Sequence, residues 1–389
     1  MKELKVLMFV NILCVSAMMA FLAVVGPIIR ALNMQEWHAG LTVSLGGILW
    51  VLLSRYWGKK SDIVGRKPIL LIGVFGVAIS YLVLAIFIDF AVVTPPLVFI
   101  SLVVLLVTRG AIGAFYSAIT PVSNALIADH VEKSKRTSYI AKLAASSGIA
   151  MIIGPSVAGY LAGYGLATPL YTFAILPLLG SVILYYALPK EEVVVKEKVP
   201  VPKLFDKRLR LPMIAAFVTM FGVITAQVCL GFFVIDKLNT DLIQGAKITG
   251  YVLACIGVSF ILSQIIISKI KTDPFVLLKF GSLIGMLGYI IVVMMDSQLV
   301  LTIGFCITAF GMGMIFPAFQ TLAVNLVTKH EQGAASGTVS AAQGMGMVVA
   351  PVVSTSLYQI NPIVPFIFTA LTFGILFVIS FIHIKKINV

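Results

Sequence analysis

Long apolar runs broken by short polar segments dominate the sequence. Each run is close to the roughly 20 residues that a helix needs to cross the hydrocarbon core of a bilayer. Runs of this length do not fit the alternating, roughly ten-residue strands of a membrane barrel. The pattern predicts an all-α polytopic membrane protein with twelve transmembrane helices, at about 5–30, 39–57, 68–88, 96–127, 138–163, 168–188, 211–235, 246–268, 275–295, 298–327, 334–358 and 362–384.

Composition supports a membrane protein. Of the 389 residues, 60% are hydrophobic and 11% are charged, and the mean hydropathy is +1.08. A soluble domain carries about 25% charged residues, so this chain has too few charges to cover a surface that faces water. The four cysteines fall inside apolar runs without the spacing of metal ligands, so we expect no metal site. The N-terminus leads directly into a full-length span, which predicts a first membrane helix rather than a removed signal peptide.

The net charge of +13 is distributed unevenly along the chain. Of the 28 Lys and Arg residues, 24 fall in the termini and in the loops that share a side with them, and Arg109 lies within a span. Only Arg30, Lys237 and Lys247 belong to the opposite side. Cytoplasmic segments of membrane proteins are enriched in Lys and Arg. We therefore expect both termini in the cytoplasm, and we do not expect nucleic acid as a partner.

Two halves and a linker are predicted. Segment 189–210 is rich in charge and proline, which is typical of a linker, and it separates an N-terminal half, 1–188, from a C-terminal half, 211–389. An internal repeat supports this division. Residues 113–130 align with 313–330 at an offset of 200, and 148–155 align with 344–351 at an offset of 196. Two such blocks in the same order indicate that spans 4 and 5 and spans 10 and 11 are copies of each other.

A polar motif lies between the second and third spans. It fits the pattern G-x-x-x-D-x-x-G-R-[KR], with Gly58, Asp62, Gly65, Arg66 and Lys67 in register. The glycines suit a tight turn of positive φ. Pro68 suits the first turn of the next helix. We interpret the whole stretch as a loop.

This motif resembles the signature loop of the major facilitator superfamily of secondary transporters. The resemblance implies two pseudo-symmetric six-helix halves with a substrate site between them near the midplane. It also implies that the carboxylate helps to latch the halves together on the cytoplasmic face. We expect Asp62 to meet the positive N-terminal end of the eleventh span near 333–336, and Arg66 to pair with Asp129.

The fifth span carries a second motif. Gly148, Gly154, Pro155 and Gly159 resemble the antiporter signature G-x-x-x-G-P-x-x-G-G of the twelve-helix drug–proton antiporters. The match departs in two ways: Gly148 lies six residues before Gly154 instead of four, and Ala158 replaces the first glycine of the final pair. Proline bends a helix and small residues allow close packing, so the resemblance implies a helix whose packing changes during antiport. Close packing alone explains the glycines equally well.

Arg109 is the basic residue that lies well inside a span. With Leu105 and Gly113 it resembles the family signature l-x-x-x-R-x-x-q-G, although Ile112 stands where that signature has Gln. A buried arginine costs at least about 2.5 kcal/mol in a membrane helix, and such residues usually face a cavity or a partner. We favour a role in substrate contact or proton coupling. The alternative is a structural hydrogen-bond hub for neighbouring carbonyls.

Further cavity candidates are polar, aromatic or methionine side chains near the middle of spans. Such surfaces suit adaptable binding of apolar ligands, although each residue on its own is more often part of helix packing. The candidates are Phe21, Phe115, Tyr116, Met151, Gln227, Tyr251, Phe316, Gln320 and Gln343.

The acidic residues bear on the substrate. All 15 are predicted in loops or at the ends of spans. Without a carboxylate near the midplane, a cavity that contains Arg109 favours neutral or anionic substrates over organic cations. Protons would couple through Asp62, Asp129 or Asp236. No Walker A motif or other cofactor motif is found, so we expect no cofactor.

We predict a secondary active exporter that works by alternating access and is not an enzyme. In the first hypothesis it exchanges protons for small amphipathic, drug-like compounds. In the second it exports an anionic metabolite such as a polycarboxylate siderophore. An uncoupled facilitator and a lipid-moving protein of the same fold remain open. We expect a monomer in the inner membrane, with the lipid bilayer, a small-molecule substrate and protons as its partners.

Overall fold

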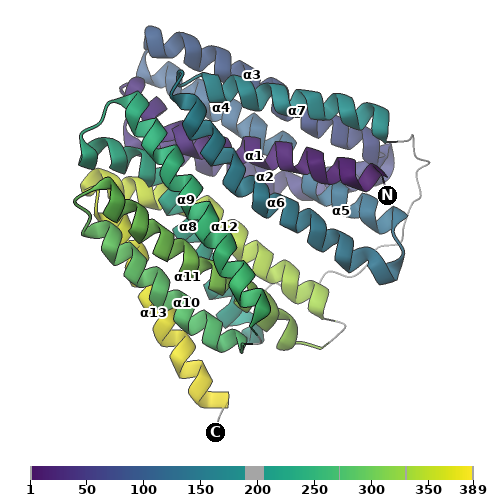
Figure 1. The fold of residues 1–389 in the computed structure, drawn as a ribbon. Helices are drawn as coiled ribbons and strands as arrows, with labels where there is room; N and C mark the ends of the chain where they lie inside the picture. The colour runs from purple at the N-terminus through teal and green to yellow at the C-terminus, as the bar shows by residue number, and fades with distance from the viewer. Residues whose placement is uncertain (1, 189–205, 271, 329–330, 388–389) are drawn as a thin grey trace. The chain divides into compact units, whose positions relative to one another are not determined.

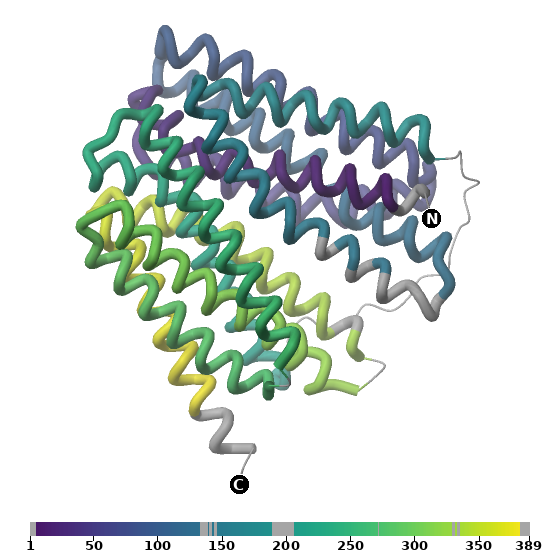
Figure 2. The backbone as a smooth tube through the Cα atoms, in the orientation of Figure 1, coloured from purple at the N-terminus to yellow at the C-terminus, as the bar shows by residue number. Residues whose placement is uncertain are grey.

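The computed structural model describes residues 2–188, 206–270, 272–328 and 331–387, and within these ranges the chain is almost entirely helical. Figures 1 and 2 show long helices joined by short connections. The helices of the first part of the chain are α1 (Lys2–Ala31), α2 (Glu36–Val64), α3 (Arg66–Val93), α4 (Val98–Tyr116), α5 (Ile119–His130), α6 (Lys133–Ala162) and α7 (Thr168–Ala187). After the short 3-10 helix η1 (Lys207–Leu209) come α8 (Arg210–Leu238), α9 (Leu242–Lys269), α10 (Pro274–Val293), α11 (Gln298–Asn325), α12 (Gln332–Ile360) and α13 (Val364–Ile387).

The predicted membrane helices are confirmed in type and approximately in number. Within the described residues, eleven helical stretches are long and apolar enough to cross a membrane, and Ser146–Ala162 of α6 is a shorter apolar stretch in the place of the fifth span. The predicted fourth span, 96–127, consists of two helices, α4 and α5, because the helix breaks at Ser117 and Ala118. Pro121 has no backbone N–H to donate to the carbonyl of Ser117, which weakens the helix at this point.

The interpretation of 58–68 as a loop is wrong for most of its length. Helix α2 continues to Val64 and α3 begins at Arg66, so the turn consists of Gly65 alone, with φ of 99°. Gly58 lies within α2 and has a helical backbone. Pro68 lies in the first turn of α3, as the sequence predicts. A single residue of positive φ is enough to reverse the chain, so the polar residues before it remain helical.

The chain divides into two compact units. The first comprises Met1–Lys198 and Thr240–Tyr251, and the second comprises Val199–Asn239 and Val252–Val389. The predicted linker, 189–210, lies outside the described residues except for its last five positions. The predicted boundaries of the two halves therefore stay a prediction.

Helix α1 is the centre of the first unit. It packs against α6 and α7, while α3 packs against α7 and α4, and α2 packs against α4. Phe21 and Ile28 of α1 are completely buried. Helices α2 and α4 come into backbone contact where Gly113 meets Gly46, because a Cβ atom built on Gly113 would lie 2.1 Å from the carbonyl oxygen of Gly46. This close crossing carries α4, and with it Arg109, into the interior of the unit.

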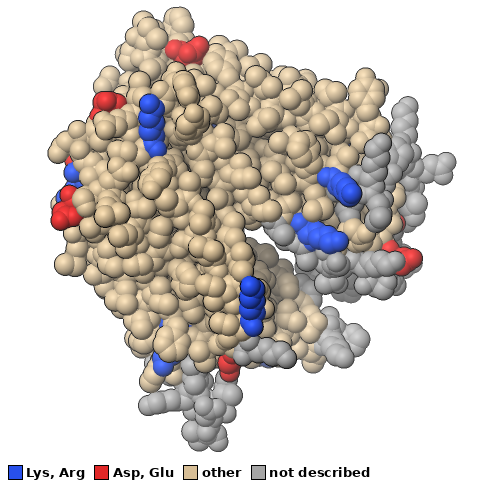
Figure 3. All heavy atoms as spheres, in the orientation of Figure 1, with Lys and Arg blue, Asp and Glu red and all other residues tan. Residues whose placement is uncertain are grey.

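Helix α8 is the corresponding buried helix of the second unit. It packs against α12, and α10 packs against both α11 and α13. Tyr289 of α10 lies among the rings of Phe305, Phe366 and Phe373 and donates a hydrogen bond to the carbonyl of Gly222 at 2.7 Å. Figure 3 shows that charged side chains are few and scattered on the face in view. An apolar outer surface of this extent is typical of a protein that is surrounded by lipid.

Candidate functional site

Arg109 lies in the interior of the first unit. Its side chain is 1% exposed, and its guanidinium carbon lies 4.5 Å from the centre of the Phe21 ring. This cation–π contact joins α4 to α1 and brings two of the predicted site residues together. The Tyr81 hydroxyl of α3 also lies beside the guanidinium and donates a hydrogen bond to the carbonyl of Ala17.

Arg109 keeps unused hydrogen-bonding capacity. Its Nε and Nη1 atoms are buried and have no hydrogen-bond partner in the described part of the chain. The ion pairs found among the described residues do not include Arg109. A buried cation with neither a carboxylate nor a full set of acceptors is costly, and in a membrane helix such a group usually faces a cavity or a partner. The Nε and Nη1 atoms of Arg109 can therefore both donate hydrogen bonds to a ligand that carries oxygen atoms.

The other predicted cavity residues of the first unit lie on α4, α6 and α9, and Tyr251 of α9 is 58% exposed. Tyr116 is 8% exposed and its ring centre lies 6.1 Å from that of Trp50. Met151 of α6 is half-buried. Gly113 serves the crossing of α2 and α4 described above, so its position is explained by packing.

Four predicted cavity residues belong to the second unit, namely Gln227, Phe316, Gln320 and Gln343. Gln227 of α8 is 8% exposed, and its side-chain oxygen is buried without a hydrogen-bond partner among the described residues. Phe316 of α11 lies between the rings of Phe260 and Phe319, at 5.5 and 5.3 Å. Gln320 of α11 and Gln343 of α12 are half-buried. A site that these residues share with Arg109 is a proposal, since Arg109 belongs to the other unit.

The glycines of the antiporter-like motif differ in what they contact. A Cβ atom on Gly154 would lie 2.3 Å from the backbone oxygen of Ser16, and one on Gly159 would lie 2.1 Å from the Cα atom of Gly250, within the same unit. Among the described residues, no atom lies within 4 Å of the corresponding position on Gly148. Pro155 lies inside α6. Close helix approach thus accounts for Gly154 and Gly159, whereas packing gives no reason for glycine at 148.

Asn11 is a buried polar residue that the sequence interpretation missed. Its side-chain amide donates hydrogen bonds to the hydroxyls of Ser146 and Ser147, at 2.9 and 2.8 Å, and to the carbonyl of Leu143, at 3.4 Å. These bonds join α1 to α6 one turn before Ala150, whose carbonyl accepts a hydrogen bond from Ser16 at 3.3 Å. The available signal was an amide within a long apolar run.

The signature motif forms a compact group that we name the Arg66 cluster: Arg66, Asp62, Asp129 and Ser61. Arg66 Nε lies 3.0 Å from an oxygen of Asp129, so the predicted pairing is present. Its Nη1 atom lies 2.5 Å from Asp62 and donates to the Ser61 hydroxyl at 2.6 Å. The Arg66 side chain is 10% exposed. The cluster ties the end of α2, the start of α3 and the end of α5 together.

Lys67 extends from the same turn toward α7. Its ammonium donates to the carbonyl of Leu188 and lies 5.2 Å from the centre of the Tyr185 ring. Together with the Arg66 cluster, this contact secures the turn at Gly65 on both sides. The residues of the sequence motif therefore form one connected group of contacts within the first unit.

Another ion pair was not predicted from the sequence. Arg30 at the end of α1 pairs with Glu36 at the start of α2, at 2.7 Å. In the second unit, Tyr358 of α12 donates a hydrogen bond of 2.9 Å to Asp236 of α8.

No group of three or more His, Cys, Asp or Glu side chains that could hold a metal ion occurs in the described part of the protein.

Comparison with known proteins agrees with this geometry. Tetracycline resistance protein, class C, of Escherichia coli is 25% identical over 339 residues, which are 82% of this chain and 80% of that protein. Tetracycline resistance protein, class H, of Pasteurella multocida is 25% identical over 376 residues, or 91% and 88% of the two chains. Multidrug resistance protein 1 of Bacillus subtilis (strain 168) is 22% identical over 363 residues, or 90% and 87%.

Solved structures show the same fold. A bacterial homologue of the human lysosomal transporter Spinster superposes with a TM-score of 0.78 at 14% identity, covering 98% of this chain and 96% of that one. The family model described as Major Facilitator Superfamily matches residues 7–340 and 280–387. The chain is therefore a multi-pass membrane protein that belongs to the Major Facilitator Superfamily.

Proposed function

We propose that this protein is a proton-coupled exporter of small amphipathic, drug-like compounds that works by alternating access. The observation that carries the proposal is its similarity, over at least four fifths of each chain, to proteins named for tetracycline and multidrug resistance. Nothing in this function requires a cofactor or a catalytic residue, because the coupled movement of protons supplies the free energy.

Arg109 is the proposed substrate or coupling residue. Its two unpartnered nitrogen atoms would bind oxygen atoms of a substrate or exchange partners when a proton arrives. Phe21 would hold the guanidinium in place through the ring contact at 4.5 Å. Tyr116, Met151, Gln227, Phe316 and Gln343 are the further proposed substrate residues and would contribute apolar and amide surface.

The proposed conformational latch is the turn that the Arg66 cluster builds. In this proposal, Asp62 and Asp129 hold Arg66 in one state, and the bonds of Asp62 are exchanged when the first unit moves against the second. Gly58, Gly65 and Lys67 belong to the same motif, and Gly65 allows the reversal of the chain. Gly148, Gly154, Pro155 and Gly159 would allow α6 to change its packing during the same movement.

We further propose a monomer in the inner membrane with both termini in the cytoplasm. The support is the placement of 24 of the 28 Lys and Arg residues on the side of the termini. A fluorescent protein fused to the C-terminus should fold and fluoresce in bacterial cells. A phosphatase fused at the same point should be active only if this orientation is wrong.

A second candidate function is the export of an anionic metabolite such as a polycarboxylate. The observation that favours it is Arg109 itself, a buried cation for which the described residues provide no carboxylate. A carboxylate substrate would bind the guanidinium through two parallel hydrogen bonds.

The discriminating experiment is an efflux panel in a bacterial host that lacks its own drug exporters. Cells that express the protein are loaded with tetracycline, with citrate as a polycarboxylate, or with the permanent cation tetraphenylphosphonium, and the retained compound is followed with time. The proposal predicts faster loss of tetracycline that stops when a protonophore is added. Export of citrate alone would favour the second candidate. Loss that the protonophore does not affect would identify an uncoupled facilitator, and strong export of the permanent cation would contradict the charge argument.

A further inference from the structure

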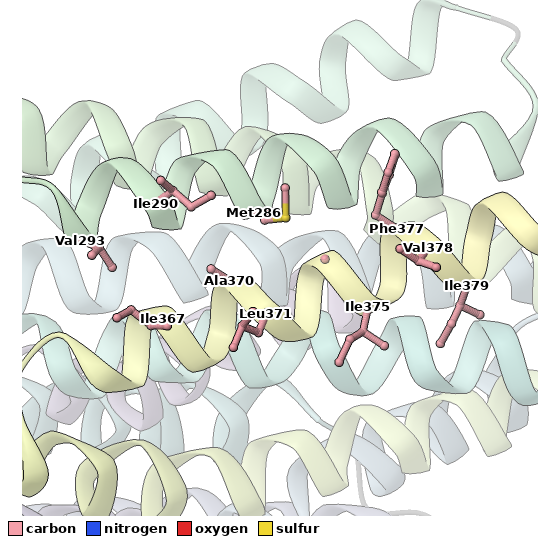
Figure 4. Close-up of a pocket in the computed structure, with 11 residues that line it drawn as sticks. Met286, Ile290, Val293, Ile367, Ala370, Leu371, Ile375, Phe377, Val378 and Ile379 are labelled. Atoms are coloured by element: carbon pink, nitrogen blue, oxygen red, sulfur yellow. The ribbon is translucent and has the colours of Figure 1, made fainter.

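A groove with purely apolar walls lies on the second unit between α10 and α13. Its volume is about 660 Å³. Figure 4 shows the lining side chains of the two helices on either side of the opening. Met286, Ile290 and Val293 follow one face of α10 at helical spacing, and Ile367, Leu371 and Val378 belong to α13. Gly374 lets the Met286 side chain approach α13 closely, since a Cβ atom there would lie 3.1 Å from the sulfur of Met286.

The groove has the length of one lipid chain. Its lining on α13 extends from Ile367 to Ile379, which at 1.5 Å per residue is about 18 Å. The hydrocarbon core of a bilayer is about 30 Å thick, so one leaflet is about 15 Å. Leu371 and Val378 are 61% and 54% exposed, so their side chains are open to an occupant. A polar ligand would find no hydrogen-bonding side chain along these walls.

One end of the groove carries a positive charge. Lys279 lies seven residues before Met286, which places it on the same face of α10 two turns away. Its ammonium lies 4.4 Å from the centre of the Phe381 ring of α13 and 5.7 Å from that of Phe280. Phe381 in turn lies three residues after Val378 of the groove wall. Among the described residues, no carboxylate forms an ion pair with Lys279.

We propose that this groove binds one acyl chain of an anionic phospholipid, with the lipid phosphate at Lys279. The two parts of the site match the two parts of the ligand: apolar walls of leaflet length, and an ammonium without a carboxylate partner at their end. Phe381 and Phe280 hold the ammonium at this place while leaving it able to pair with the phosphate. The proposal does not depend on which compound the protein transports.

The test is native mass spectrometry of the purified full chain with added dioleoyl phosphatidylglycerol or dioleoyl phosphatidylcholine. One basic residue near an anionic lipid favours binding by about five-fold. We expect at least that preference for phosphatidylglycerol in the wild type, a preference near one in Lys279→Gln, and recovery in Lys279→Arg. Dihexanoyl phosphatidylglycerol, which has the same headgroup and short chains, should bind much more weakly because it leaves the groove empty.

The matched control is Lys142→Gln. Lys142 of α6 also places its ammonium near an aromatic ring, 5.0 Å from the centre of Tyr139, and belongs to the other unit. This variant should keep the wild-type preference. Equal binding of the two lipids by the wild type would overturn the proposal, as would an unchanged preference in Lys279→Gln or equal binding of the short-chain lipid. A dimer without bound lipid would show that a second copy covers the groove instead.

Discussion

At the scale of single residues, the proposed transport site contains a buried cation that is incompletely partnered. Arg109 is held by Phe21 and neighboured by Tyr81, and two of its nitrogen atoms have no acceptor among the described residues. Removing a buried charge of this kind relieves its desolvation cost, which offsets part of the contacts that are lost. A role in transport and a purely structural role therefore predict different outcomes for the same substitution.

Arg109→Ala should abolish transport, with a drop of at least ten-fold in the rate of substrate efflux. Expression and the elution profile in detergent should stay those of the wild type. Arg55→Ala, which removes an exposed cation of α2, is the control and should transport normally. Normal efflux by Arg109→Ala would remove the proposed role, and a variant that aggregates would favour the structural hub.

Asp62→Asn should lower turnover several-fold without changing which substrates bind. The asparagine keeps the size of the side chain but loses the charge that faces Arg66 at 2.5 Å, so the balance between conformations shifts. Transport rates and the order of preference among substrates are compared with those of Asp89→Asn, whose carboxylate accepts from Tyr171 at 3.2 Å and serves as the control. An altered order of preference with intact turnover would contradict a latch.

At the scale of elements, the sequence predicts the helices well and their connections less well. The apolar runs define the spans because lipid leaves the backbone no other arrangement. The break between α4 and α5 was missed, since Pro121 lies within an uninterrupted apolar run. The polar residues before Gly65 were assigned to a loop, although a helix can extend beyond the apolar run with its polar residues outside the lipid.

The partners of the buried polar side chains cannot be predicted from the sequence, for a different reason. Arg109 is visible as a charge within a span, but its neighbours Phe21 and Tyr81 come from other helices. Asn11 likewise reaches serines more than 130 positions away. Which helix faces which depends on the packing of the whole unit, and spacing along one helix carries no information about it.

The two glycines of the signature motif should respond oppositely to alanine. Gly65 has φ of 99° and ψ of 157°, a conformation that costs an L-residue about 1–3 kcal/mol, so Gly65→Ala should lower the thermal unfolding temperature. Gly58 lies in α2, and a Cβ atom there would lie 3.9 Å from Pro121, an ordinary contact. Gly58→Ala should therefore leave stability unchanged or raise it by about 0.5–1 kcal/mol. Equal losses in both variants would show that the turn is not limited to Gly65.

At the scale of the whole molecule, the chain consists of two units built around buried helices, α1 in one and α8 in the other. Two exposed ion pairs lie near the first described residues of the second unit. Arg208 of η1 lies 2.8 Å from Glu331, which precedes α12, and also pairs with Asp206 at 2.6 Å. These contacts connect the described end of the predicted linker to the element that begins the eleventh span.

This connection should depend on pH in a defined direction. The hydrogen bonds from Arg208 and Thr328 lower the pKa of Glu331 from 4.5 to about 2. A carboxyl group whose pKa is lowered by folding stabilises the folded state above the pKa of the unfolded chain, and this contribution is lost as the pH falls through the folded pKa. Glu331→Gln should therefore unfold at a lower temperature than the wild type at pH 7. The difference should shrink between pH 4.5 and about 2, and a difference that stays constant over this range would contradict the pairing.

We propose that this protein exchanges protons for an amphipathic substrate through Arg109. The most direct test is uptake of tetracycline into proteoliposomes with an acidic lumen and a neutral exterior. We expect accumulation that requires the pH gradient, collapses when the gradient is dissipated with nigericin, and is absent in Arg109→Ala but present in Arg55→Ala. Accumulation that is equal with and without the gradient, or that persists in Arg109→Ala, would contradict it.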